Sequence, residues 1–379
     1  MVWVVNVIST IYIYFFIVML KLCGVNGRFL MYGLLYWLLL LVMFQINVSF
    51  ELIDEKLASF HSFEMYLGTR YSNSFLVQYI LALPMFSLFE SEYTAHALNI
   101  ALQSLFFVLF LHLVGSRHLK IALAGLLLYP AFIHYTVSGL RDPLLNLVSL
   151  AIVYGAIVFD KTKFLFLCCV LAVVCNFIRP EYSLIIGGLI FLRYYVDLDG
   201  KKAKLITIVC GLAALYCALL VMPLAFGMPV SSNAFVNVET MIQFNTLRHD
   251  RTVGLASTHI LGGALLTYPI FIRYPIQVVA SFVTPLPMDF RGGVMLFAAL
   301  DSLIFCVVVF VAYLRSKLSK TATFLFYCGA VYILLQALFA FNYGNLLRVR
   351  YPSYIFFLAS VCFANLSWST AGRPVSGLR

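Results

Sequence analysis

Charged residues are scarce in this sequence. It contains 25 basic and 15 acidic residues among 379, which is 11% of the chain, whereas 63% of the residues are hydrophobic. A soluble domain carries charge on about 25% of its residues. A water-soluble protein of this length could not cover its surface with so few ionic groups. The composition therefore excludes a soluble enzyme and a DNA-binding domain, and no nucleic-acid partner is expected.

Several motifs with a known chemistry are also missing. The nine cysteines show no CxxC spacing, and none falls in a predicted outer loop, so the sequence indicates neither a disulfide framework nor a structural zinc site. It contains no GxxxxGK[ST] and no HExxH motif. The predicted membrane spans carry no acidic pair and no row of arginines at mid-depth, where an ion-coupled transporter places its ionisable residues.

The apolar residues occur in long runs. A helix needs about 20 such residues to cross a bilayer. We therefore predict an all-α, polytopic membrane helix bundle of about 11–13 transmembrane helices, in one integral membrane domain of residues 1–379. The predicted spans are Val2–Leu20, Phe29–Ser49, Thr94–Val114, Leu119–Thr136, Pro143–Phe159, Phe164–Phe177, Tyr182–Tyr195, Leu205–Leu224, Val294–Leu314, Thr321–Phe341 and Tyr351–Trp368.

Two outer loops, residues 50–93 and 226–293, carry apolar segments of a different kind. Asn73–Phe89 contains a proline and is followed by glutamates, which predicts a re-entrant or interfacial helix. Thr258–Pro287 is broken by four prolines. It forms either a short hairpin of two spans or a segment that lies on the surface.

Lysine and arginine in the short loops predict the orientation, because cytoplasmic loops carry an excess of these residues. Fifteen of the 25 basic residues fall on one face together with only three acids, and nine of the fifteen are lysine. That face is predicted to be cytoplasmic, with the N-terminus outside and the C-terminus inside. On the outer face nine of ten basic residues are arginine. Because a guanidinium holds phosphate through two parallel hydrogen bonds, this predicts an anionic ligand; arginines that snorkel at helix ends are the alternative.

Two outer turns combine an arginine, an acid and a proline before an inward-going helix. Arg141 and Asp142 precede Pro143 in the first, and Arg179 and Glu181 flank a proline in the second. A helix N-terminus offers free N–H groups to an anion, and the arginines would add formal charge. The structural alternative is that Asp142 caps its helix ahead of the proline and that the helix dipole favours Glu181.

The last outer turn, before the final predicted span, carries two arginines. Arg348 and Arg350 lie at i and i+2 and point the same way if the backbone is extended, which would make a clamp suited to a diphosphate. Asn345 and Tyr351 lie beside them. This turn is the best predicted ligand site.

Two further features lie in the outer loops. His249, between two arginines and next to Asp250, is a candidate general base oriented by the acid, although a loop histidine is more often simply solvated. Asp54 and Glu55 lie in an acidic loop whose oxygens suit Mg²⁺ or Mn²⁺, although a solvated charged turn is the commoner explanation.

The sequence resembles bacterial polysaccharide repeat-unit polymerases of the Wzy-like type, the O-antigen polymerases, which are related to membrane glycosyltransferases of the GT-C type. The resemblance lies in Pro130–Asp142 between two spans, in Phe282–Pro287 before a late span, and in Asn345–Pro352 before the last one. It covers the organisation of most of the chain, and the motifs are short.

The resemblance implies polysaccharide biosynthesis at the bacterial inner (cytoplasmic) membrane. The expected reaction moves a glycan from a polyprenyl diphosphate carrier, such as undecaprenyl diphosphate, onto another lipid-linked unit at the periplasmic face. The polymer would be lipopolysaccharide O-antigen, capsule or exopolysaccharide, and a chain-length regulator protein is a possible partner. Arg141, Arg179 and Arg348 would hold the diphosphate without a metal or other cofactor. The proton of the attacking hydroxyl would pass to Glu181, Asp142 or His249.

Two alternatives remain open. A GT-C glycosyltransferase that uses a polyprenyl-monophosphate sugar would bind a divalent cation at Asp54 and Glu55. A flippase or transporter of lipid-linked glycans would require a polar central pathway.

Overall fold

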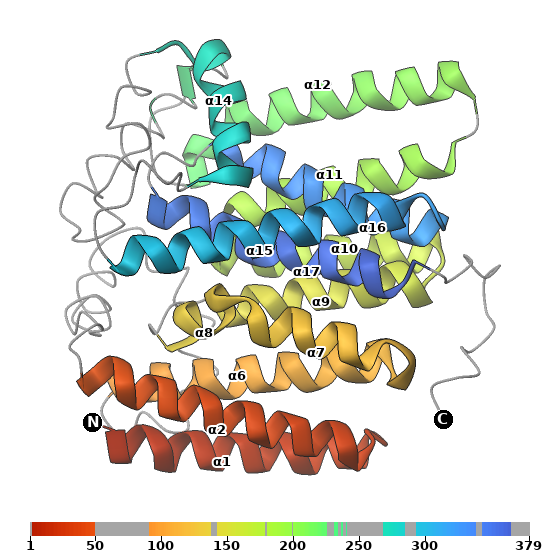
Figure 1. Cartoon of the computed structure of the whole chain (residues 1–379). Helices are drawn as coiled ribbons and strands as arrows, with labels where there is room; N and C mark the ends of the chain where they lie inside the picture. Colours follow the sequence, from red (N-terminus) through yellow and green to blue (C-terminus); the bar gives the residue numbers. More distant parts are fainter. Residues whose placement is uncertain are drawn as a thin grey trace. The chain divides into compact units, whose positions relative to one another are not determined.

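The computed structural model describes residues 2–49, 91–137, 142–178, 180–198, 200–225, 231–233, 236–237, 240, 268–284, 293–338 and 343–364. Every regular element among these residues is a helix (Figure 1), which confirms the predicted all-α class. The chain divides into two compact units, Met1–Tyr154 and Gly155–Gly372. The prediction of a single membrane domain stays a prediction.

The first unit consists of helices close to the predicted spans. Its elements are α1 (Val2–Leu22), α2 (Gly27–Ser49), α6 (Ser91–Val114), the 3-10 helix η1 (Ser116–His118), α7 (Leu119–Leu128), α8 (Pro130–Val137) and α9 (Asp142–Val158), which continues into the second unit. The predicted span Leu119–Thr136 is wrong as a single helix, because it divides into α7 and α8. Tyr129 is extended between them, with φ −88° and ψ 105°, since a proline disfavours helical backbone in the residue before it.

The second unit contains the remaining described helices. They are α10 (Lys161–Ile178), α11 (Pro180–Asp197), α12 (Lys201–Ala225), α14 (Ile270–Val283), α15 (Gly293–Ser316), α16 (Lys320–Ala337) and α17 (Tyr343–Cys362). The predicted start of the last span at Tyr351 is wrong, because α17 begins at Tyr343 and continues through Pro352. A proline lacks one helical hydrogen-bond donor but does not always end a helix.

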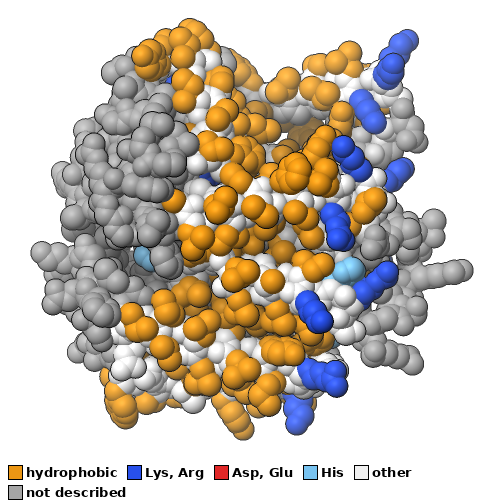
Figure 2. All heavy atoms as spheres, in the orientation of Figure 1, with side chains coloured by type: hydrophobic (Ala, Val, Ile, Leu, Met, Phe, Trp, Pro, Cys, Tyr) orange, Lys and Arg blue, Asp and Glu red, His pale blue; other side chains and the backbone are white. Residues whose placement is uncertain are grey.

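Within the described part of the chain, six helices are long and apolar enough to cross a membrane, namely α1, α2, α6, α12, α15 and α16. Only 6% of the apolar stretch of α12 is buried within the protein, and Figure 2 shows hydrophobic side chains over the visible sides of the helices. Soluble monomers rarely expose apolar surface on this scale. These observations support the prediction of a membrane helix bundle, whereas the total of about 11–13 crossings stays a prediction.

Helix α14 has its polar side turned inward. Arg273 and Gln277 are each 1% exposed, whereas Phe271 is 72% and Val279 61% exposed. A helix in water shows the opposite pattern, with its apolar stripe buried. The helix lies in the undecided region Thr258–Pro287 and has 14 residues, which makes it about 21 Å long and shorter than the hydrocarbon core of about 30 Å.

In the first unit, basic residues gather at one end. The α1–α2 turn carries Lys21 and Arg28, and the segment after α6 carries Arg117 and Lys120. These two places share an end because Phe29 of α2 lies edge-on to His112 of α6, with ring centroids 6.0 Å apart. Phe44 and His96, at the other ends of α2 and α6, are also adjacent at 5.2 Å.

The second unit also has a basic end, formed by the turns that carry Lys161, Lys201 and Lys320. Arg193 of α11 lies over the rings of Phe164 of α10 and Phe324 of α16, at 5.8 and 5.4 Å. The same end holds the C-terminus of α17, because the Ser360 hydroxyl donates to the Ala322 carbonyl of α16 at 2.8 Å. The N-termini of α15 and α17 therefore lie at the opposite end. Within each unit, the basic turns therefore lie at a common end, as the sequence predicts.

Asp160 fixes the turn before α10. Its carboxylate accepts from the Lys163 backbone N–H at 2.9 Å and lies 3.6 Å from the Lys163 ammonium. The backbone hydrogen bond, supported by the lysine charge, lowers the pKa of this carboxyl below its usual value of 3.8. Because the pKa of this carboxyl is lower in the folded state than in the unfolded state, the ionised carboxylate stabilises the fold at pH values above the unfolded-state pKa. This stabilisation is lost as the pH falls through the folded-state pKa.

We therefore expect a pH-dependent effect of Asp160→Ala. Wild type should melt at a higher temperature than the variant in detergent at about pH 6, where the carboxyl is ionised, and the gap should narrow as the pH falls below the usual pKa of 3.8. Thermal unfolding followed by circular dichroism measures both. A gap that widens at the lower pH would contradict this account.

Candidate functional site

The predicted site residues fall into three groups. Arg141, Arg179 and His249 lie outside the described residues, as do Asp54 and Glu55 of the predicted cation loop. The backbones of Glu181 in α11 and of Asn345 and Arg348 in α17 are helical, but their side chains lie outside the described part. The side chains of Asp142, Arg350 and Tyr351 are described, and all three are fully buried.

Asp142 heads a row of buried polar side chains in the first unit. It begins α9 and is 0% exposed, and Asn146 and Ser149 follow it at helical spacing on the same side of α9. Helix α6 carries a matching row. The polar seam, as we call these two rows, consists of Asp142, Asn146 and Ser149 of α9 and His96, Asn99 and Gln103 of α6, all at most 2% exposed.

The two rows of the polar seam meet. The Asn146 amide donates to the Gln103 side-chain carbonyl at 2.9 Å, and apolar residues flank the contact, with Leu98 and Leu102 of α6 packed against Leu144 and Leu147 of α9. His96 places the seam toward the end of the first unit that faces away from its basic turns. Polar residues inside a membrane bundle are costly and usually functional.

Removing one partner of this contact should destabilise the first unit. Asn146→Leu removes the amide that donates to the Gln103 carbonyl, and we expect a loss of about 0.6–1.7 kcal/mol, the range measured for hydrogen bonds between membrane helices. Detergent-induced unfolding measures the loss. The double variant Asn146→Leu/Gln103→Leu should recover part of it; purely additive losses would show that the two amides do not interact.

Arg350 is the centre of a buried cluster in the second unit. It is 0% exposed. Its Nε donates to the Ser281 carbonyl at 2.6 Å, its Nη1 to the Ser302 hydroxyl at 2.5 Å, and its Nη2 to the carbonyls of Ala280, at 3.2 Å, and Thr284. The arginine cluster, as we call Arg350 with these partners and Asp301, therefore joins α14, α15 and α17.

Asp301 supplies the opposite charge in the arginine cluster. Its Oδ2 lies 3.9 Å from Arg350 Nη1, and the residue is 4% exposed. Asp301 is nine residues into α15 and Arg350 eight into α17, so both lie about 11–12 Å along their helices from the end opposite the basic turns. An ion pair at this depth is rare in membrane proteins and marks functional or strongly constrained positions.

The predicted clamp of Arg348 and Arg350 is wrong in its geometry. It requires an extended backbone, but both residues lie in α17, and positions two apart in an α-helix are separated by about 200° around the axis. The described donors of Arg350 are already engaged by protein acceptors. The structure thus gives Arg350 a structural role, while Arg348 and Asn345 remain predicted ligands. Tyr351, fully buried in α17, presents no exposed ring to a sugar.

Arg273 adds a second buried guanidinium to this side of the second unit. It is 1% exposed on the inward side of α14, one residue before Tyr274, whose hydroxyl donates to the Leu334 carbonyl of α16 at 2.9 Å. Leu334 lies near the C-terminus of α16, away from the basic end. Asp301 is the one buried carboxylate among the described side chains of this unit.

Several members of these clusters escaped sequence reasoning. His96, Asn99 and Gln103 have the three-to-four-residue spacing of one helix face, as do Asn146 and Ser149 after the predicted Asp142, and this spacing could have identified them. Asp301 is the single acid in its apolar run and could have been found by its isolation. That Arg350 pairs with it could not, because the two are far apart in the sequence.

No group of three or more histidine, cysteine or acidic side chains among the described residues could hold a metal ion. Comparison of the chain with protein families, with curated proteins and with solved structures finds no match.

Proposed function

We propose that the protein is a polysaccharide polymerase of the bacterial inner membrane, which joins polyprenyl-diphosphate-linked oligosaccharide units at the periplasmic face. The observation that carries this proposal is the buried charge in the part of the second unit that lies away from its basic turns. Arg273 and Arg350 are buried there, with Asp301 as the one buried carboxylate among the described side chains of this unit. A buried guanidinium group favours an anionic ligand because it can donate two parallel hydrogen bonds to phosphate, and a diphosphate is such a ligand.

The chemistry follows from the bond that breaks. A sugar hydroxyl of one unit attacks the anomeric carbon of the other, the bond from that carbon to the diphosphate oxygen breaks, and a base takes the hydroxyl proton. Negative charge develops on the leaving diphosphate, where fixed guanidinium groups stabilise it. Arg141, Arg179 and Arg348 are the proposed phosphate ligands, with Arg273 as an addition.

Three residues are proposed as the base. Asp142, Glu181 and His249 carry groups that can accept the proton, and of these the structure describes the side chain of Asp142. It lies in the polar seam beside Arg141 in the sequence, at a helix start that also suits an anion. Asp142 is therefore the first choice.

Reconstitution tests the proposal directly. Purified protein in liposomes, given a polyprenyl-diphosphate-linked oligosaccharide, should produce lipid-linked chains of two or more units on a gel, with no loss in EDTA. Arg348→Ala and Arg141→Ala should abolish the long chains at unchanged protein level. Activity that disappears with EDTA and with Asp54→Asn would instead support the monophosphate-sugar glycosyltransferase.

Transport of lipid-linked glycans is a second candidate, favoured by one observation. The Arg350–Asp301 pair lies inside helices, where transporters place ionisable groups. The same liposomes separate the two functions. Movement of labelled lipid-linked glycan to the other leaflet without any joined product would establish transport and reject the polymerase.

A further inference from the structure

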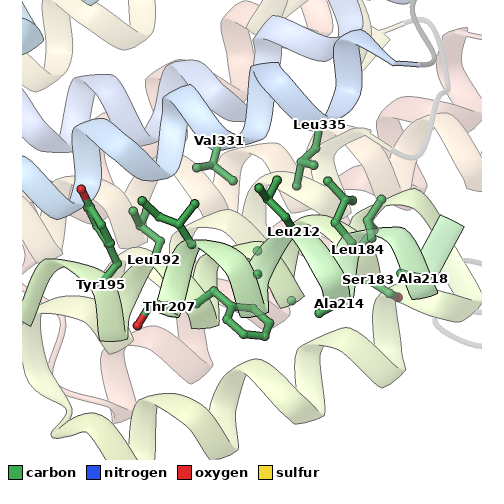
Figure 3. A pocket seen from close by; sticks show the side chains of 16 residues that line it. Ser183, Leu184, Leu192, Tyr195, Thr207, Leu212, Ala214, Ala218, Val331 and Leu335 are labelled. Atoms are coloured by element: carbon green, nitrogen blue, oxygen red, sulfur yellow. The ribbon is translucent and has the colours of Figure 1, made fainter. Parts of the chain in front are cut away.

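A cavity of about 430 Å³ lies between α11, α12 and α16 in the second unit. Figure 3 shows its lining side chains, with Tyr195 and Thr207 at one end and Ser183 and Ala218 at the other. From Ser183 to Tyr195 the lining extends about 18 Å along α11. The volume is that of a ligand site, and the shape is long.

The lining is almost entirely apolar. The serine and threonine hydroxyls in the lining already donate to backbone carbonyls: Ser183 to the carbonyl of Ala172 at 2.7 Å, and Thr207 to the carbonyl of Ala203 at 3.0 Å. Glycines keep the cavity open: a Cβ at Gly187 would meet nothing within 4 Å. A sugar or a nucleotide would lose its hydrogen bonds with water in such a place, whereas a hydrocarbon chain would not.

One end of the cavity adjoins cationic side chains. The Lys204 ammonium lies 5.6 Å from the centre of the Tyr195 ring, which lines the cavity. Lys201 and Lys202, one turn earlier in α12, are exposed. Lysine side chains at a membrane surface attract anionic lipid headgroups. An apolar channel that ends at a lysine group therefore matches a molecule with a hydrocarbon chain and an anionic head.

We propose that this cavity binds an anionic phospholipid, with one acyl chain between α11 and α12 and the phosphate at Lys201, Lys202 and Lys204. The proposed headgroup position lies at the basic end, whereas the arginine cluster lies toward the opposite end, and the inference does not depend on the proposed reaction. The bound chain fills the space between α12, which exposes nearly all of its apolar stretch, and its neighbours α11 and α16.

Native mass spectrometry of the detergent-purified full chain tests the proposal, with phosphatidylglycerol and phosphatidylcholine as titrated probes. Wild type should retain phosphatidylglycerol in preference to phosphatidylcholine. Gly187→Leu, whose Cβ would meet nothing within 4 Å, places a side chain in the cavity and should abolish retention. Lys201→Gln/Lys202→Gln/Lys204→Gln should weaken binding about fivefold for each lysine.

Two controls match these variants. Gly27→Leu makes the same change where a Cβ also meets open space, far from the cavity in the sequence and in the other unit. Lys161→Gln/Lys317→Gln/Lys320→Gln removes the same charge from exposed positions of the same end. Both should bind like wild type, and all variants should elute as folded protein on size exclusion.

Several results would overturn the proposal. One is that Gly187→Leu retains as much phosphatidylglycerol as wild type does, and another is that wild type binds the two lipids with equal affinity. The proposal also fails if both triple lysine variants weaken phosphatidylglycerol binding equally, or if inorganic phosphate competes with the lipid at similar affinity. Displacement of phosphatidylglycerol by a polyprenyl phosphate at lower concentration would also reject it, in favour of a carrier-lipid site.

Discussion

Replacing Arg350 with methionine is expected to destabilise the protein by about 3–5 kcal/mol, the usual cost of removing one member of a buried ion pair. The change leaves Asp301 as an uncompensated buried charge. It also removes the donors to the carbonyls of Ser281 and Thr284. Because the cluster joins α14, α15 and α17, the variant should fail to accumulate in the membrane or should unfold at markedly lower SDS concentration, measured by circular dichroism.

A double variant tests whether the destabilisation by Arg350→Met comes from the unpaired buried charge of Asp301. Arg350→Met/Asp301→Leu removes both charges, and such replacements are often neutral or stabilising, so it should regain at least half of the lost stability. Lys317→Met removes an exposed cation and should change stability by less than about 1 kcal/mol. An Arg350→Met protein of normal stability that lacks only glycan chains would show that Arg350 acts on substrate and not on the fold.

Asp142→Asn is expected to lower polymerisation about 10²–10⁴-fold, the usual contribution of a general base. Asparagine caps a helix start as well as aspartate does, so α9 and the polar seam should persist, and the variant isolates the negative charge. Product length and initial rate in the reconstituted liposomes measure the effect. The amount of folded protein should equal that of wild type.

The matched control is Asp160→Asn, which makes the same change at a helix start on the basic end and should leave the rate unchanged. Glu181→Gln and His249→Ala, assayed together with it, identify the base if it is another residue. Full activity in Asp142→Asn would remove Asp142 from the reaction. A rate loss accompanied by loss of folded protein would show that its carboxylate serves the packing of α9.

Much of the fold was accessible from the sequence, because a span requires about 20 contiguous apolar residues and such runs can be read directly. Helices such as α1, α2, α6 and α12 lie within a few residues of their predicted ranges. The errors in the predicted helix boundaries occur at two prolines. Pro130 interrupts a run that hydropathy alone joins, whereas α17 continues through Pro352, where a helix start was expected.

An all-helical, strongly apolar protein whose lysines gather in particular turns could be predicted from the sequence, since composition and contiguity are local properties. Which polar residues meet is set by how the helices pack. Arg350 lies 49 positions from Asp301, and Gln103 lies 43 from Asn146, and no local pattern shows that either pair is in contact. The reason is physical: burial creates the need for a partner, and helix packing, not sequence spacing, chooses it.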